Sequence, residues 1–301
     1  MAGEESMRHD RSFDHRSLFH PARPGGLRLR AIGTHRVHGP LTLAPGLGAD
    51  LVSGAAAPGP ISLIGPPLPH MVKSAPEVLQ SLANMRAKAD LSFVEIARAE
   101  CLEWDGRVFN HADIVRRFPD LLGQHPARAA YFRALGSWPA RDIAALVADL
   151  PTAQRLTETD RAFLSGLRPQ ISTEASLEAA IEDICHRLGE VVFVTHFTAQ
   201  RPDGTPLRAR RNFVRLLAGI LRRMGRAFTD PSRDVDAYGQ ARAVSGPGFN
   251  RYTSDFERHL CQRWLSAYVI PRLEHPTKEP RAPARQVPAG QAPAPAGWAL
   301  A

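Results

Sequence analysis

The sequence predicts an α/β protein built as a three-layer sandwich, with helices on both faces of a mostly parallel sheet. Three observations predict this class. Short apolar runs alternate along the chain with longer segments that have helical spacing. The clearest run, VVFVTHF at 191–197, is nearly continuous in β-branched and aromatic residues, as strands buried on both faces are. Glycine and proline end several of the runs.

Four segments have the character of strands. The first, 27–32, leads into Gly33, and the second, 61–64, is stopped by Gly65-Pro66-Pro67. The third and fourth are 91–97 and 191–197. Since helical segments separate these runs, we expect the strands to be parallel and joined by crossover helices.

Helical spacing and capping residues predict seven helices, at 75–85, 112–118, 126–135, 140–150, 176–188, 206–224 and 251–270. The last is predicted to stop before Pro271. The helix at 206–224 carries an apolar stripe opposite a row of arginines, namely Arg208, Arg211, Arg215 and Arg222. We interpret that row as the solvated face of an amphipathic helix, and a polyanion site is the alternative.

These elements predict three regions. Residues 1–26 are polar, rich in Arg and His, and form a flexible N-terminal arm. Residues 27–273 form the α/β domain, with a helical insertion at about 110–172. Residues 274–301 are a Pro/Ala-rich tail, predicted to be disordered because proline at that density opposes both helices and strand pairing.

Composition excludes several classes of protein. The 301 residues contain no apolar run near the ~20 needed to cross a bilayer, and the start is polar rather than a secretory leader. Three widely spaced cysteines form no disulfide framework and no metal pair, which favours the cytoplasm. The net charge is +8, and nearly all of the Lys and Arg residues are arginine, as in proteins of GC-rich bacterial genomes. No nucleic-acid-binding motif accompanies that charge, which argues against a nucleic-acid partner.

Polar side chains gather where the predicted strands end. Ligands of open α/β sheets bind at the carboxyl ends of strands, so these positions are the candidates for chemistry. They are Thr34, His35 and Arg36 after the first strand, Glu95 and Arg98 at the third, His196 at the fourth, and Asn250, Arg251 and Tyr252 before the last helix.

Five short segments in this order resemble the SGNH/GDSL hydrolase fold, in particular its GSCFA-like branch and the capsule-biosynthesis acetyltransferases. They are AIGTHRVHGPL (31–41), LSFVEIARAE (91–100), VVFVTHFTA (191–199), FTDPSRDVDAYGQARA (228–243) and NRYTSDFERHL (250–260). The resemblance implies an esterase or acetyltransferase that acts on acyl groups of a carbohydrate or another small molecule. It requires no metal and no bound cofactor, with acetyl-CoA as co-substrate for an acetyltransferase.

The chain departs from that pattern at two positions. The family's Ser or Cys nucleophile falls on His35, and its histidine base falls on Arg251, which stays protonated and cannot accept a proton. Under the resemblance, His35, His196 and Glu95 are the candidate catalytic residues. Thr34, Arg36, Arg98, Asn250, Arg251 and Tyr252 are the candidate substrate-binding residues.

Other interpretations stay open. The chain is either an enzyme of this kind or a non-catalytic protein that binds a glycan or an anion on the same fold. A third hypothesis is an interaction protein that recruits partners through its basic helix and its tail. Glu95 either orients a catalytic group or pairs with Arg36, because a carboxylate buried among Phe93, Val94 and Ile96 needs a partner.

Overall fold

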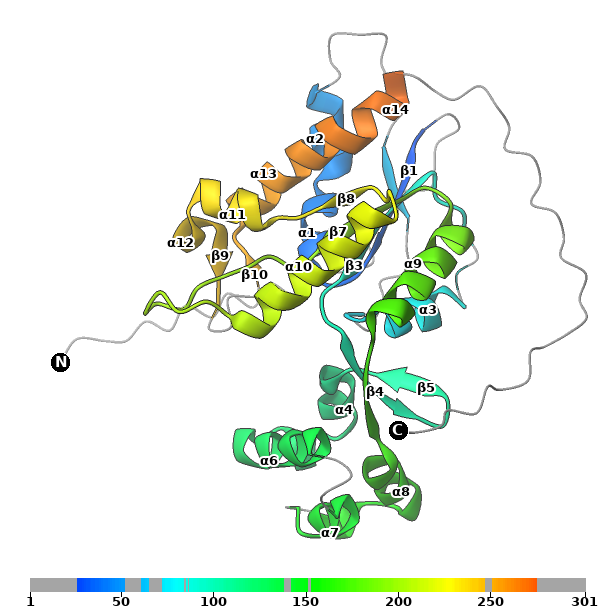
Figure 1. Ribbon diagram of the computed structural model, residues 1–301, viewed down its shortest axis with the longest axis vertical. Helices are drawn as coiled ribbons and strands as arrows, with labels where there is room; N and C mark the ends of the chain where they lie inside the picture. Colours follow the sequence, from blue (N-terminus) through cyan, green and yellow to red (C-terminus); the bar gives the residue numbers. More distant parts are fainter. Residues whose placement is uncertain are drawn as a thin grey trace, which may run out of the picture.

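The centre of the fold is a five-stranded sheet in which every neighbouring pair is parallel (Figure 1). The computed structural model describes residues 26–51, 61–64, 72–83, 85, 87–137, 142–150, 153–246 and 251–274. The strand order is β2-β1-β3-β7-β8, with bounds β1 (Arg28–Ile32), β2 (Ser62–Ile64), β3 (Leu91–Ile96), β7 (Val191–Thr195) and β8 (Phe228–Thr229). The predicted N-terminal arm, except its last residue, and the predicted tail, except Glu274, lie outside the described residues.

Helices cover both faces of this sheet and confirm the predicted three-layer class. One face packs against α1 (His35–Thr42), α2 (Ala44–Leu51) and α13 (Ser254–Trp264). The other packs against α3 (Ala75–Leu82), α9 (Glu174–Leu188) and α10 (Arg208–Arg223). Successive side chains of a strand point to opposite faces, so both faces must be apolar to be buried. Accordingly, Phe93 of β3 belongs to the first core and Val94 to the second.

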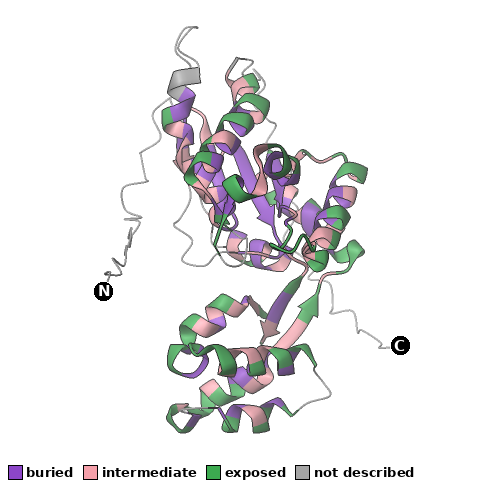
Figure 2. Cartoon of the chain, turned by 90° about the vertical axis from the view of Figure 1, so that its left-hand side faces the viewer, coloured by how far each residue is buried: buried purple, intermediate pink, exposed green. Residues whose placement is uncertain are grey.

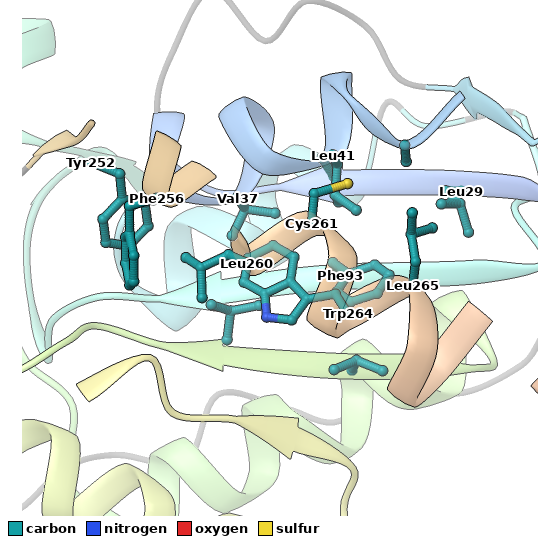
Figure 3. Packing of buried hydrophobic residues seen from close by; sticks show 14 of the residues in the cluster. Leu29, Val37, Leu41, Phe93, Tyr252, Phe256, Leu260, Cys261, Trp264 and Leu265 are labelled. Atoms are coloured by element: carbon teal, nitrogen blue, oxygen red, sulfur yellow. The ribbon is translucent and has the colours of Figure 1, made fainter. Parts of the chain in front are cut away.

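Aromatic rings fill the first core, between α13 and the sheet (Figure 3). Phe93 stacks on Trp264 with ring centroids 5.5 Å apart. Tyr252 and Phe256 meet edge to face at 5.1 Å, at the end of the same core. Stacked and edge-to-face rings stabilise a core beyond the area that they bury. Helix α13 is thereby fixed on the sheet, and Tyr252 is fixed with it.

Residues 100–171 form a second body, which we call the helical lobe (Figures 1 and 2). It has its own core around Phe163, which is fully buried. Its helices are α4 (His111–Arg117), α5 (Pro119–Leu122), α6 (His125–Gly136), α7 (Ile143–Ala148) and α8 (Glu158–Gly166), with a 3-10 turn at Ala153–Arg155. Gln80 of α3 joins the lobe to the α/β body, since its side chain exchanges hydrogen bonds of 2.8 and 2.9 Å with the backbone of Val108.

Besides its helices, the lobe contains three strands that the sequence analysis did not predict. It contains an antiparallel sheet of order β5-β4-β6, formed by β4 (Glu100–Trp104), β5 (Arg107–Phe109) and β6 (Arg168–Ile171). Asp105 and Gly106, both with positive φ (51° and 69°), form the two-residue loop between β4 and β5. An Asp-Gly pair between strand-like segments is the sequence signal of such a hairpin. It was missed because the run at 91–97 was taken as the only strand of this region.

The predicted helix at 251–270 is also different in the structure. Arg251 and Tyr252 form β10, which pairs with β9 (Val244–Ser245), and α13 begins only at Ser254, with Thr253 as its N-cap. After α13 a π-helical turn (Leu265–Val269) leads into α14 (Ile270–Glu274). Pro271 comes two residues after the π-helical turn, and the helical segment continues through it to Glu274, so the predicted stop before Pro271 is wrong.

Two short helices, α11 (Ser232–Tyr238) and α12 (Gln240–Ala243), complete the described fold. Within the described ranges, none of the helices combines the length and the apolar character that a bilayer span requires.

Candidate functional site

The candidate site lies where the strand order of the parallel sheet reverses. From β1 the chain builds β2 on one side, and then β3, β7 and β8 on the other. A crevice for ligands forms at the carboxyl ends of the two strands on either side of such a reversal. Here those strands are β1 and β3. Gly33 directly follows β1, and Glu95 lies near the end of β3.

The turn after β1 depends on a glycine and a threonine. Gly33 has φ of +148°, which disfavours other residues, and a Cβ there would come within 2.6 Å of the Glu95 Cβ. Thr34 is the N-cap of α1, and its side chain accepts a hydrogen bond from the Arg36 N–H. His35 is the first residue of α1 and is half-buried. The turn therefore brings α1 directly against the end of β3.

Glu95 connects this turn to β3. One of its oxygens accepts hydrogen bonds from the Thr34 N–H (2.8 Å) and from the Thr34 hydroxyl (2.5 Å). The other accepts from Nε of Arg36 (2.7 Å) and lies 2.6 Å from a terminal nitrogen of the same guanidinium. Glu95 is 0% exposed, Thr34 2% and Arg36 5%. The carboxylate is thus paired with Arg36, one of the two interpretations that the sequence left open.

His196, directly after β7, is held as a neutral hydrogen-bond donor. Its Nδ1 accepts a 2.8 Å hydrogen bond from the Phe197 N–H, so the neutral ring carries its proton on Nε2. Burial is the largest cause that lowers the pKa of His196 well below 6.5, and the charges of Arg36 and Arg210 lower it further. The charge of His35 also lowers the pKa of His196, as the smallest of these causes.

Tyr252 reaches the same edge of the sheet from β10. Its ring lies 5.2 Å from the ring of Phe197, which in turn lies 4.8 Å from the ring of His196. Burial raises the pKa of Tyr252, and the nearby charge of Arg36 opposes that rise. The Tyr252 hydroxyl is buried and has no hydrogen-bond partner among the described residues. A buried hydroxyl without a partner is costly, so it is a candidate contact for a ligand.

Sequence reasoning missed Arg210, the third residue of α10. Its guanidinium lies 5.5 Å from the centroid of the Phe197 ring. Burial, and secondly the charge of Arg36, lowers the pKa of Arg210 to about 10. Arg210 also lines a cavity of about 650 Å³ formed by residues 201–210. The signal was present, because Arg210 is an arginine that stands outside the row assigned to the solvated face of this helix.

The structure brings together Thr34, His35, Arg36, Glu95, His196 and Tyr252, but not Arg98 or Arg251. Thr34 is at the site, although its hydroxyl already serves Glu95 and the helix cap. Arg98 lies 3.5 Å from the Glu77 carboxylate, in a different cluster. Arg251 is exposed and has no ion pair or hydrogen bond of its side chain among the described residues, and Asn250 lies outside them.

The sequence is similar to a known protein whose name places it in polysaccharide biosynthesis. The family model of the TviD N-terminal domain matches residues 67–267. The "Vi polysaccharide biosynthesis protein TviD" of Salmonella typhi is 24% identical over 185 residues, which are 60% of this chain. The aligned region covers 22% of that relative, so the chain corresponds to about a fifth of its length.

Solved structures of an acetyl xylan esterase from Geobacillus stearothermophilus are similar over much of the chain. Two variants align with a TM-score of 0.40 and identities of 10% and 9%, over 81% of this chain and 94% of theirs. The family itself follows from the sequence match, which spans well over half of the residues. The chain belongs to the TviD N-terminal domain family.

Proposed function

We propose that this chain transfers or hydrolyses acyl groups of a carbohydrate, as an SGNH-like acetyltransferase or esterase. The observation that carries the proposal is the imidazole of His196, held after β7 as a neutral Nε2–H donor, whose pKa is lowered by burial and by charges that include Arg36 and His35 of the turn after β1. The name of the relative in Salmonella typhi, a polysaccharide biosynthesis protein, supports a saccharide as the substrate class.

In this proposal, His35 acts as a general base. It stands at the position where the SGNH/GDSL hydrolases have a Ser or Cys nucleophile, and a hydroxyl of the substrate or of water is the nucleophile here. Its imidazole takes the proton of an attacking hydroxyl, from a sugar in acyl transfer or from water in hydrolysis. The hydroxyl oxygen bonds to the acyl carbonyl carbon and forms a tetrahedral oxyanion. When this collapses, the bond to the leaving group breaks, and the leaving thiolate or alkoxide takes the proton back from His35.

His196 supplies the second role. Its Nε2–H is a preorganised donor in a buried site, and such donors stabilise an oxyanion more strongly than water does. Because its Nδ1 is already occupied by the Phe197 N–H, His196 suits a donor and not a base. In this proposal, Arg36, Arg210 and the Tyr252 hydroxyl contact the substrate.

Glu95 and Thr34 act as positioning residues in this scheme. Glu95 has no exposed surface and its oxygens are occupied by Thr34 and Arg36, so it cannot contact a substrate. It holds the turn that carries His35. Arg251 has no catalytic role here, because an exposed guanidinium does not accept a proton.

The test is turnover by the purified chain, with aryl acetates as acyl donors and with acetyl-CoA plus saccharide acceptors. His35→Ala and His196→Ala should each lower kcat/KM by roughly a hundredfold or more. The control is His186→Ala, which removes an exposed imidazole from α9 and should leave turnover unchanged. Turnover that survives both site variants would place the chemistry elsewhere.

A second candidate function is a non-catalytic protein that binds a glycan or an anion. The arginine at the position of the family's base favours it, as do the buried guanidinium group of Arg36 and the half-buried one of Arg210. Saturable binding of saccharides without turnover, weakened by Arg210→Ala, is the result that would select this candidate.

A further inference from the structure

A cavity of about 700 Å³ lies between the α/β body and the helical lobe, apart from the residues assigned to acyl chemistry. Lys73, just before α3, lines it from the body, and residues of α4 and α6 line it from the lobe. Of the described residues in its wall, none is acidic. Five are basic: Lys73, His111, Arg116, His125 and Arg128.

The positive charge of this wall is only partly balanced. Arg116 pairs with Asp113 at 2.8 Å. The side chains of Lys73, His125 and Arg128 have no ion pair or hydrogen bond with any other described residue. Cations gathered in a concave site with low-dielectric walls concentrate a positive potential and attract anions.

The pKa of His111 reflects both its burial and this positive potential. Burial is the main cause that lowers its pKa to about 4, and the positive charges of Arg98 and Lys73 lower it further. Burial also lowers the pKa of Lys73, with Arg98 as the second cause, while the charges of Glu77 and Asp113 partly oppose the change. Both groups are thus in surroundings that oppose a further positive charge, and a bound anion would relieve that opposition.

We propose that this cavity binds a ligand through its phosphoryl groups. A diphosphate carries two or more negative charges and many acceptor oxygens, which match several cations at once, whereas one carboxylate matches a single cation. The volume is that of a small-molecule site and exceeds what a single ion needs. Phe132, stacked on His111 with ring centroids 4.2 Å apart, offers an apolar wall for the rest of the ligand.

The position of Lys73 connects this cavity with the candidate site. The charge of Arg36 contributes to lowering the pKa of Lys73, and the Lys73 carbonyl accepts hydrogen bonds from the N–H groups of Ala97 and Arg98, just after β3. The cavity wall at Lys73 therefore borders the residues just after β3. The inference goes beyond the proposed function and does not depend on it, because phosphate binding here needs no acyl chemistry.

The test is calorimetric titration of the whole chain with pyrophosphate at low ionic strength. We expect saturable binding, weakened roughly tenfold or more by Arg128→Ala and by Lys73→Ala, and kept by Arg128→Lys. The matched control is Arg133→Ala, which removes the same charge from an exposed position of α6 outside the cavity and should leave the affinity unchanged. Far-UV circular dichroism of each variant checks that it is folded.

Three further arms identify the source of the phosphoryl group. ADP that binds more tightly than pyrophosphate indicates a nucleotide, whose base packs on the apolar wall, and glucose 1-phosphate that binds more tightly indicates a sugar phosphate. Malonate that binds as tightly as pyrophosphate would overturn the preference for phosphate. An equal loss in Arg128→Ala and Arg133→Ala, or no saturable binding to wild type, would overturn the site.

The two proposals fail separately. Aryl acetates carry no phosphate, so their hydrolysis by the wild-type chain tests the acyl chemistry without the cavity, and Arg133→Ala, outside both sites, should hydrolyse them at the wild-type rate. If pyrophosphate does not bind but aryl acetates are turned over, only the proposed phosphate site is rejected. Pyrophosphate binding without any turnover rejects only the acyl chemistry.

Discussion

Glu95 and Thr34 are separated by 61 residues and are joined by two hydrogen bonds to one carboxylate oxygen. The Thr34 N–H and the Thr34 hydroxyl both donate to it, at 2.8 and 2.5 Å. Arg36 occupies the other oxygen, so the carboxylate holds both ends of the first turn of α1. The position of His35, which lies between these two partners, depends on this contact.

Glu95→Ala should destabilise the protein by about 3–5 kcal/mol, because removing one partner of a buried ion pair leaves the Arg36 guanidinium uncompensated. Urea unfolding followed by circular dichroism measures the change. Glu100→Ala, at an exposed position of β4, is the control and should stay within about 0.5 kcal/mol of wild type. Equal effects of the two substitutions would mean that the pair does not hold the turn.

The imidazole of His196 should remain neutral across the physiological range, with its proton on Nε2. The reason is its burial beside Arg36 and Arg210, together with the hydrogen bond from the Phe197 N–H to Nδ1. Nitrogen-15 NMR of the ring distinguishes the two tautomers, and the signals are assigned by their loss in His196→Gln. A titration midpoint near 6.5, the ordinary value, would contradict the described environment.

Glu257 of α13 should make stability fall as the pH rises. It lies against Gly39 of α1, and burial raises its pKa from 4.5 to about 7. The folded state then holds this proton more tightly than the unfolded state. Ionisation therefore costs stability between the two pKa values, and the full cost is present above about 7.

Glu257→Gln removes that charge. The variant should gain stability over wild type as the pH rises through this window, and the gain should vanish below 4.5. Denaturant unfolding at both ends of the window measures it. Asp255→Asn, at an exposed position of the same helix, is the control and should show a much smaller dependence on pH. A pH-independent difference for Glu257→Gln would show that the carboxyl is not buried in this way.

Local patterns in the sequence predicted four of the five strands of the main sheet and missed the two-residue edge strand β8. The runs 27–32, 61–64, 91–97 and 191–197 are the strands β1, β2, β3 and β7, with ends shifted by at most two residues. The β4–β5 hairpin was missed, although its Asp105-Gly106 turn was visible, because 91–97 was taken as the only strand of that region. Arg251 was predicted to lie in a helix. In the structure it pairs with Ser245 in an antiparallel strand pair, and helical spacing gives no signal of such a pairing.

The sequence by itself determined the class of fold and the candidate positions at the strand ends, because alternation of apolar runs and the carboxyl-end rule are local properties of the chain. Only the tertiary structure decided what those residues do to each other. It paired Glu95 with Arg36, left Arg98 with Glu77 and brought Arg210 beside Phe197. Burial, proton position and the balance of charge arise from neighbours that are distant in the chain, and no local pattern encodes their distances.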